Sequence, residues 1–259
     1  MKLNYKNAAQ AKRDTGMSYI GAVNSSAKIL KNEKFNELTY IIYLAPADLS
    51  GYEVCPKRTA ECTHACLFGS GQVIMDKTNR IVESRIKKTQ MFFENRDYFM
   101  AWVVKEIEQA KAKAEKKGMN FSVRLNGTSD LQPTLFKYNG KVLFDIFPDV
   151  QFYDYTKVSN RFRLLDTYKN YDLTFSYSGH NWSTCEDILD NKSGRVAVVF
   201  EKTLPETYKG YKVIDGDSYD MRYVDDKNVI VGLKFKRVKN KVEKTNNAFI
   251  VAIDDINRK

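Results

Sequence analysis

Short apolar runs alternate along the chain with helical patterns, and together they predict the secondary structure. Runs rich in β-branched and aromatic residues, bounded by turn-forming residues, are typical of buried strands. We expect strands at residues 38–44, 120–125, 150–156, 171–177, 194–200, 211–217, 228–235 and 248–253. Between residues 78 and 117, apolar residues recur at three- and four-residue intervals, which predicts a helical region ending at Gly118. Within it, Asn95 or Asp97 is placed to begin a second helix.

The order of these elements predicts the fold class. Strands that alternate with helices are typical of parallel βαβ units, and nearly continuous apolar runs indicate a sheet covered on both faces. We therefore predict an α/β fold: a single TIM-like βα barrel, complete or incomplete, over residues 38–259. A doubly wound open sheet is the alternative. Residues 1–37 are less regular and are expected to form an N-terminal cap segment.

Three of the four cysteines lie in one stretch, CPKRTAECTHAC, at residues 55–66. The chain has no run of about 20 apolar residues and begins with a polar segment, so we expect a cytoplasmic protein. Disulfides are rare in that compartment, where clustered thiols more often bind metal or do chemistry. We therefore predict that Cys55, Cys62 and Cys66, in the loop after the first predicted strand, bind one metal centre. The alternative is that these cysteines share no role.

The kind of metal depends on a fourth ligand, for which His64 and Cys185 are the candidates. Four nitrogen and sulfur ligands would form a closed zinc site. Three cysteines and an open position suit a [4Fe–4S] cluster that holds a small molecule at its unique iron. The residues leave both possibilities open.

Polar side chains follow the predicted strands, at the end of a βα barrel where active sites lie. They are Arg124, Asn126, Thr128, Ser129 and Asp130, then Asp154, Tyr155, Thr156 and Lys157, then Ser176, Tyr177, Ser178, His180 and Asn181, and finally Asp215, Asp217, Asp220 and Arg222. In the stretch RLNGTSD, Arg124 is suited to hold a carboxylate or phosphate, and Asp130 to bind an amine or act as a base. The alternative is an ordinary turn in which Asp130 caps the next helix.

The charge of the chain indicates a partner. The 42 Lys and Arg residues exceed the 32 Asp and Glu residues, which gives a net charge of +10. A cationic surface favours nucleic acid, and a generally lysine-rich proteome is the alternative explanation. No phosphate-binding GxxxxGK[ST] loop, GxGxxG fingerprint after a strand, HExxH zinc motif or GxSxG elbow occurs in the sequence. We expect no membrane partner.

Three stretches carry a resemblance to a known family: CPKRTAECTHACLFGSGQ, RIKKTQMFF with VRLNGTSDL, and a C-terminal region from YDLTFSYSGHN to VGLKFK. They resemble phage and plasmid proteins named after a mycobacteriophage gene product, number eighty-eight. The similarity extends from about residue 38 to the C-terminus. It implies a phage-type origin, and hence a host-cell cytoplasmic location, but no established activity.

A looser resemblance concerns the chemistry. Three cysteines after the first strand of a βα barrel are similar to the arrangement in radical S-adenosylmethionine enzymes, although the spacing C-x6-C-x3-C departs from the usual C-x3-C-x2-C. This resemblance implies a [4Fe–4S] cluster on the three cysteines and S-adenosylmethionine as cosubstrate. It assigns cosubstrate binding to Arg124, Asn126, Ser129 and Asp130. Asp154, Lys157, Tyr177 and His180 are then expected, with Asp130, to contact or act on the substrate.

We therefore expect a phage-type metal enzyme that modifies nucleic acid or its precursors. One alternative is a barrel stapled by zinc that exchanges or removes a nucleic-acid base, with Asp130 or Asp154 as nucleophile or base. The other is a basic nucleic-acid-binding protein with structural zinc and no catalytic activity.

Overall fold

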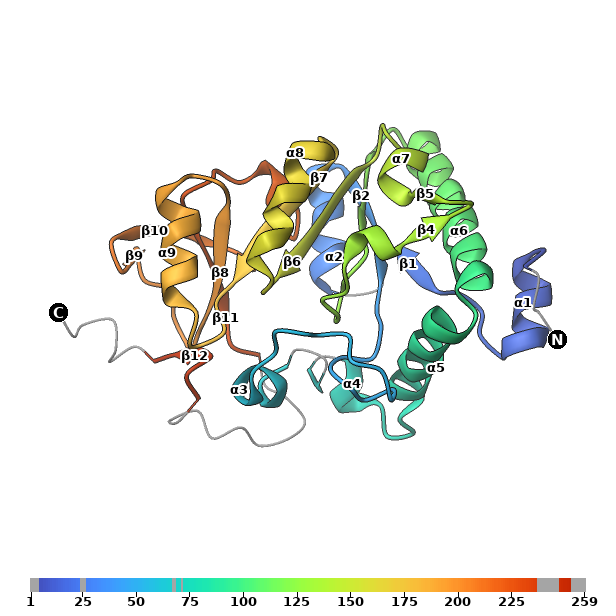
Figure 1. The fold of residues 1–259 in the computed structure, drawn as a ribbon, viewed down its shortest axis with the longest axis horizontal. Helices are drawn as coiled ribbons and strands as arrows, with labels where there is room; N and C mark the ends of the chain where they lie inside the picture. The colour runs from blue at the N-terminus through green and yellow to red at the C-terminus, as the bar shows by residue number, and fades with distance from the viewer. Residues whose placement is uncertain (1–4, 24–26, 67–68, 71, 237–246, 253–259) are drawn as a thin grey trace. The chain divides into compact units, whose positions relative to one another are not determined.

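The protein is described here from a computed structural model, which describes residues 5–23, 27–66, 69–70, 72–236 and 247–252 (Figure 1). The chain forms two compact units. Unit 1 comprises Met1–Pro56 and Thr78–Tyr153, and unit 2 comprises Lys57–Lys77 and Asp154–Lys259. The expected division into a cap segment and one domain from residue 38 stays a prediction.

Unit 1 contains two long helices and a set of mainly parallel strands. Its elements are α1 (Ala8–Thr15), β1 (Gly21–Val23), α2 (Ala27–Asn32), η1 (Glu33–Phe35), β2 (Glu37–Ile42), α5 (Arg80–Glu94), α6 (Arg96–Lys116), β3 (Asn120–Arg124), η3 (Pro133–Leu135), β4 (Lys137–Tyr138), β5 (Lys141–Val142) and α7 (Leu143–Ile146). Strand β6 (Gln151–Thr156) begins in unit 1 and ends in unit 2. All six residues of β2 are buried, as expected for a strand with neighbours on both sides and covered faces.

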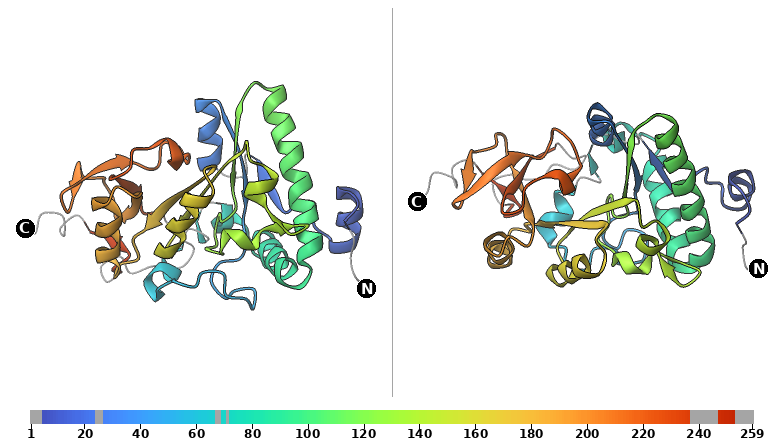
Figure 2. Two further views of the ribbon diagram at one scale, coloured as in Figure 1. Left: turned by 45° about the horizontal axis from the view of Figure 1, so that its top comes forward. Right: turned by 90° about the horizontal axis from the view of Figure 1, so that it is seen from above.

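The helices of unit 1 follow the predicted periodicity. Helix α6 buries an apolar stripe that includes Phe99, Trp102, Val103 and Ile107, and it packs against β1, β2 and β3 (Figures 1 and 2). The helical region ends as predicted, since Gly118 follows the helix with a φ of 64°, which glycine adopts without a Cβ penalty. Asn95 separates α5 from α6, although its side chain makes no capping hydrogen bond.

Unit 2 contains the remaining strands and several short helices. Its elements are α3 (Ala60–His64), α4 (Gln72–Met75), η4 (Ser159–Arg163), α8 (Leu164–Thr167), β7 (Tyr171–Ser176), α9 (Trp182–Asp190), β8 (Arg195–Phe200), β9 (Thr207–Tyr208), β10 (Tyr211–Asp215), η5 (Arg222–Val224), β11 (Ile230–Lys234) and β12 (Ile250–Val251). Its core is formed by β7, β8, β11 and α9, with Phe175, Leu189, Val198, Phe200 and Ile230 among the buried residues.

The order of the strands confirms the α/β class but shows that the predicted single βα barrel is wrong. The order is β1-β2-β3-β6-β7-β8-β11-β10-β9, with β12 beside β8. The two end strands, β1 and β9, are antiparallel to their neighbours, so the sheet is mixed and does not close. A βα barrel would pair β8 with the next parallel strand in the chain, but β11 lies between β8 and β10.

The cysteine stretch also differs from its expected place. Strand β1 lies within residues 1–37, where we expected a cap, and it pairs with β2. Cys55 therefore follows the second strand and not the first. In the part of the chain that the structure describes, no helix has both the length and the apolar character needed to cross a bilayer.

Candidate functional site

The loop after β3 in unit 1 is organised around the buried side chain of Asn126. Its Oδ1 accepts hydrogen bonds from Ser129 Oγ (2.8 Å) and Leu131 N (2.9 Å). Its Nδ2 donates to Leu131 O at 3.1 Å. Both ends of the amide are therefore used to shape residues 126–131. Asn126 and Ser129 thus shape their own loop, and cosubstrate binding by these two residues stays a prediction.

The same loop is tied to the chain that follows β2. Gly127 N donates to Ile42 O at 2.9 Å, and Thr128 Oγ1 donates to Leu44 O at 2.5 Å. A Cβ on Gly127 would lie 2.7 Å from Ile42 O, so a larger residue could not approach β2 in this way. Since β2 and β3 are parallel, these contacts bring two loops together at the carboxyl ends of both strands. Ligands of open α/β sheets bind at this edge.

Asp130 and Arg124 lie at the same edge. Arg124 is the last residue of β3 and is half-buried, as is Asp130. Asp130 donates its backbone N–H to Val54 O at 2.7 Å, which is a third link to the chain after β2. The first helical element after Asp130 is the short η3, which begins after Gln132, so Asp130 does not cap a helix. Ligand binding by Arg124 and Asp130 stays a prediction.

Cys55 occupies the loop after β2 and has a polar environment. Its Sγ accepts a hydrogen bond from Ala47 N at 3.5 Å, and Ala47 adopts a positive φ of 54°, which is uncommon for a residue other than glycine. The Cys55 backbone N–H donates to Glu53 Oε1 at 2.7 Å.

In unit 2, the segment that contains α3 lies at the carboxyl end of β7. Thr59 Oγ1 donates to Ser178 O at 3.3 Å, and His180 Nε2 lies 3.3 Å from Glu61 Oε1. Asn247 Nδ2 donates to Glu61 O, also at 3.3 Å. The hydrogen bond from its own backbone N–H, followed by the contact with His180, lowers the pKa of Glu61. Two of these contacts fix the segment beside the loop after β7, and the third joins it to the chain before β12.

Two of the three clustered cysteines belong to this segment. Thr59 Oγ1 accepts a hydrogen bond from Cys62 N at 3.1 Å, which caps the first turn of α3. Cys62 and Cys66 are both half-buried. The boundary between the units falls after Pro56, so Cys55 belongs to unit 1. That all three cysteines bind one centre stays a prediction.

Three observations bear on the metal ligands. No disulfide links the four cysteines, all of which lie among the described residues. Cys185 is fully buried in the core of unit 2, and this burial raises the pKa of its thiol to about 12. A thiol that stays protonated is a poor ligand, so Cys185 is disfavoured as the fourth one. Within the described ranges, no three His, Cys, Asp or Glu side chains form a preassembled metal-binding group.

The other residues of unit 2 that we expected to contact the substrate make different contacts. Asp154 is 2% exposed and accepts a hydrogen bond from the Tyr171 hydroxyl at 3.3 Å. The Tyr177 hydroxyl donates to Gly179 O at 2.9 Å, within the loop that carries His180. The Lys157 Nζ lies 5.5 Å from the centroid of the Phe249 ring. Tyr177 and His180 thus share a loop beside α3, whereas Asp154 lies within the body of the sheet.

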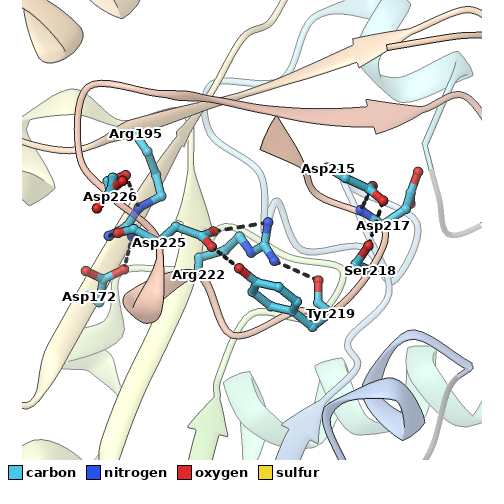
Figure 3. A network of polar contacts seen from close by, with 9 residues as sticks. All are labelled: Asp172, Arg195, Asp215, Asp217, Ser218, Tyr219, Arg222, Asp225 and Asp226. Atoms are coloured by element: carbon cyan, nitrogen blue, oxygen red, sulfur yellow. Dashed lines mark hydrogen bonds and ion pairs between the residues drawn. The ribbon is translucent and has the colours of Figure 1, made fainter. Parts of the chain in front are cut away.

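A buried polar network in unit 2 was not foreseen from the sequence (Figure 3). Arg195 is 2% exposed, forms an ion pair with Asp172 at 2.5 Å, and donates to the backbone oxygens of Asp225 (2.9 Å) and Asp226 (3.4 Å). Arg222 is fully buried and forms an ion pair with Asp225 at 3.2 Å. Since Asp172 and Arg195 lie at the starts of β7 and β8, this network is at the opposite end of the strands from α3.

Other residues of the network extend it toward the chain after β10. The Tyr219 hydroxyl donates to Asp225, and Arg222 donates to Tyr219 O at 2.8 Å (Figure 3). Asp215 and Asp217 are instead used in the turn after β10, where Asp215 accepts hydrogen bonds from Asp217 N and Ser218 Oγ. The polar residues expected after this strand therefore divide into a turn and a buried ion-pair network.

Comparison with known proteins gives one match. The family model described as Gene product 88 matches residues 4–251. The chain belongs to the Gene product 88 family. This match confirms the resemblance to the phage gene-product family, and it covers more of the N-terminus than the motifs did. No curated protein and no solved structure matches the chain.

Proposed function

We propose that this Gene product 88 protein is an enzyme whose cysteine segment binds a metal centre and whose substrate is a nucleic acid or one of its precursors. The observation that carries the proposal lies within unit 2. There, the segment with Cys62 and Cys66 is fixed at the carboxyl end of β7, beside His180. Catalytic and binding groups of α/β sheets gather at this edge.

The donor set supports a metal that prefers sulfur. Cys62 and Cys66 are half-buried and therefore reachable, and neither forms a disulfide. Thiolates select zinc or iron–sulfur clusters, whereas magnesium and calcium prefer oxygen ligands. Cys55, with its N–H donor, is the third ligand that the sequence spacing predicts. A [4Fe–4S] cluster with S-adenosylmethionine would supply electron transfer, and zinc would supply Lewis acidity.

The residues beside the segment have their own expected roles. His180 Nε2 lies 3.3 Å from Glu61 Oε1, so the imidazole is positioned beside a carboxylate. Lys157 is a candidate contact for an anionic substrate, since it follows β6 at the same end of the strands as the loop after β7. The net charge of +10 favours a polyanion or a phosphorylated precursor as the substrate.

Metal analysis after anaerobic purification tests this proposal. If the centre is an iron–sulfur cluster, we expect bound iron and absorption at roughly 400 nm. If it is a zinc site, we expect bound zinc and a colourless protein. Cys62→Ala and Cys66→Ala should lose the metal. Cys185→Ala, the matched control, removes a core cysteine and should keep it. Wild-type protein without metal, or equal metal in all three variants, would refute the proposal.

Nucleic-acid binding separates the enzyme from a binding protein. We expect the affinity for DNA or RNA to fall steeply with salt, because bound cations release counterions from phosphates. Product formation that depends on Cys62 and Cys66 supports the enzyme. Metal and nucleic-acid binding without any product would instead favour a binding protein with structural zinc.

A further inference from the structure

Lys88 in unit 1 is a buried lysine that the metal proposal does not use. It lies on α5 and is only 5% exposed. Its Nζ lies 4.1 Å from the centroid of the Tyr19 ring. Within the part of the chain that the structure describes, no hydrogen bond or ion pair reaches this nitrogen. A buried ammonium group without an acceptor is costly, and loss of its proton removes the buried charge.

Glu106 on α6 attracts Lys88 electrostatically but is held by other donors. Its carboxylate accepts hydrogen bonds from the Tyr40 hydroxyl (2.6 Å), Ile20 N (2.9 Å) and Gly21 N (2.9 Å). These three donors fix the carboxylate at the start of β1. Lys88 and Glu106 both lie in the described part of the chain, and no ion pair joins them. The amine of Lys88 is therefore not committed to a salt bridge with Glu106.

This environment favours the neutral form of the amine. Burial has the largest effect and lowers the pKa of Lys88 to about 8, while Glu106 opposes this effect and Arg85 adds to it. At pH 7, about one tenth of an amine with this pKa is neutral, against roughly 0.03% of an ordinary lysine with a pKa of about 10.4. The neutral amine is the nucleophile that attacks carbonyl carbon, and desolvated lysines form imines in enzymes.

The ring that covers Lys88 is only loosely held. Tyr19 is 51% exposed and lies between α1 and β1, outside any helix or strand. Among the described residues, its side chain makes no hydrogen bond and no contact with another aromatic ring. Rotation of this one side chain would therefore open a path from solvent to the amine without unfolding a helix or a strand.

The position of Lys88 in the fold also fits a ligand site. Gly21, which Glu106 holds, pairs with Ile42, the last residue of β2. Helix α5 is tied to the chain just beyond this strand, since Ala45 N donates to Thr89 Oγ1 at 2.9 Å. Lys88 precedes Thr89 in the helix, so its amine lies near the carboxyl end of β2. Ligands of α/β sheets bind at this end of the strands.

We propose that Lys88 forms an imine with a small aldehyde or ketone at the carboxyl end of β2. The nitrogen lone pair attacks the carbonyl carbon, the carbon–oxygen bond breaks, and the oxygen leaves as water with the two amine hydrogens. The step needs no oxidant or reductant. The carbonyl compound is small because the lysine is 5% exposed, which excludes a polymer held at the surface. The step uses none of the cysteines, so this proposal and the metal proposal fail separately.

Reductive trapping tests the imine. Propanal is the probe, and cyanoborohydride converts the imine to a stable alkylamine that mass spectrometry of peptides locates. At pH 7, Lys88 of the wild-type protein should be alkylated at least about tenfold faster than the exposed Lys87, because more of its amine is neutral. The Lys88 rate should level off as the propanal concentration rises, since a site binds the aldehyde before it reacts. The Lys87 rate should instead rise in proportion to the concentration.

Two controls separate a folded site from a lysine that is reactive for other reasons. In protein unfolded by urea, Lys88 should react within about twofold of Lys87, because burial no longer lowers its pKa. Lys87→Met is the matched variant and should leave the saturable reaction at Lys88 unchanged. Equal rates at the two lysines of the folded protein, a Lys88 rate that never levels off, or a fast rate that persists in urea would each overturn the proposal.

Discussion

Gly127→Ala should destabilise the protein by closing the space between two loops of unit 1. The new Cβ would lie 2.7 Å from Ile42 O and 2.8 Å from the Tyr43 ring, whereas ordinary contacts are 3.4–4 Å. The backbone oxygen belongs to a buried strand and cannot move away as a flexible side chain could. The loop must therefore shift and give up the 2.9 Å hydrogen bond from Gly127 N to Ile42 O.

The expected cost follows from these two effects. Overpacking costs about 1–3 kcal/mol, and the lost hydrogen bond about 1 kcal/mol. Together they lower the free energy of unfolding by about 2–4 kcal/mol, which corresponds to a fall in melting temperature of roughly 5–15 °C for a chain of this size. Urea denaturation followed by circular dichroism measures the first quantity, and a thermal melt the second.

Gly140→Ala is the matched control. Gly140 lies in the turn between β4 and β5 with a φ of 79°, and a Cβ there would have no atom within 4 Å. Its substitution therefore carries only the backbone cost of a left-handed alanine, about 1–2 kcal/mol. If Gly127→Ala proved no more destabilising than Gly140→Ala, the close approach of the two loops would be wrong.

Two further predictions concern buried charges. Arg195→Met should lower the free energy of unfolding by about 3–5 kcal/mol, because it leaves Asp172 and two backbone oxygens without their donor. Lys105→Met removes an exposed ion pair with Glu108 and should cost less than about 1 kcal/mol in the same urea titration, so equal losses would contradict this reasoning. Burial lowers the pKa of Lys88 from 10.5 to about 8, so the unfolded chain binds more protons between these values and the free energy of unfolding should rise with pH across that window. Lys88→Met should lack this rise, and parallel pH profiles of the two proteins would refute the assignment.

The secondary structure was largely predictable from the sequence because buried strands have continuous apolar runs. β3, β6, β7, β8, β10, β11 and β12 all lie within predicted ranges, and β2 begins one residue before its range. The pairing of the strands was not predictable. β11 inserts between β8 and β10, and this order depends on packing between distant segments and not on any local pattern. β1 has three residues, too few for a period to be recognised.

The candidate sites show a similar limit. Asn126 follows a strand in a polar turn and therefore looks like a ligand-binding residue, but its amide is satisfied by its own loop. A polar turn after a strand has the same sequence pattern whether its side chains bind a ligand or shape the loop. Lys88 shows a related limit, because a lysine in an amphipathic helix is normally placed in solvent, whereas tertiary packing buries this one.

The division of the chain has a consequence for protein synthesis. Residues 57–77 belong to unit 2, but they are made before most of unit 1. Thr59 contacts a residue 119 positions later, and Glu61 one that is 186 positions later. At about 5–20 residues per second, the ribosome needs roughly 10–40 s to supply these last partners. During that interval the segment that carries Cys62 and Cys66 lacks the partners that hold it in the folded protein.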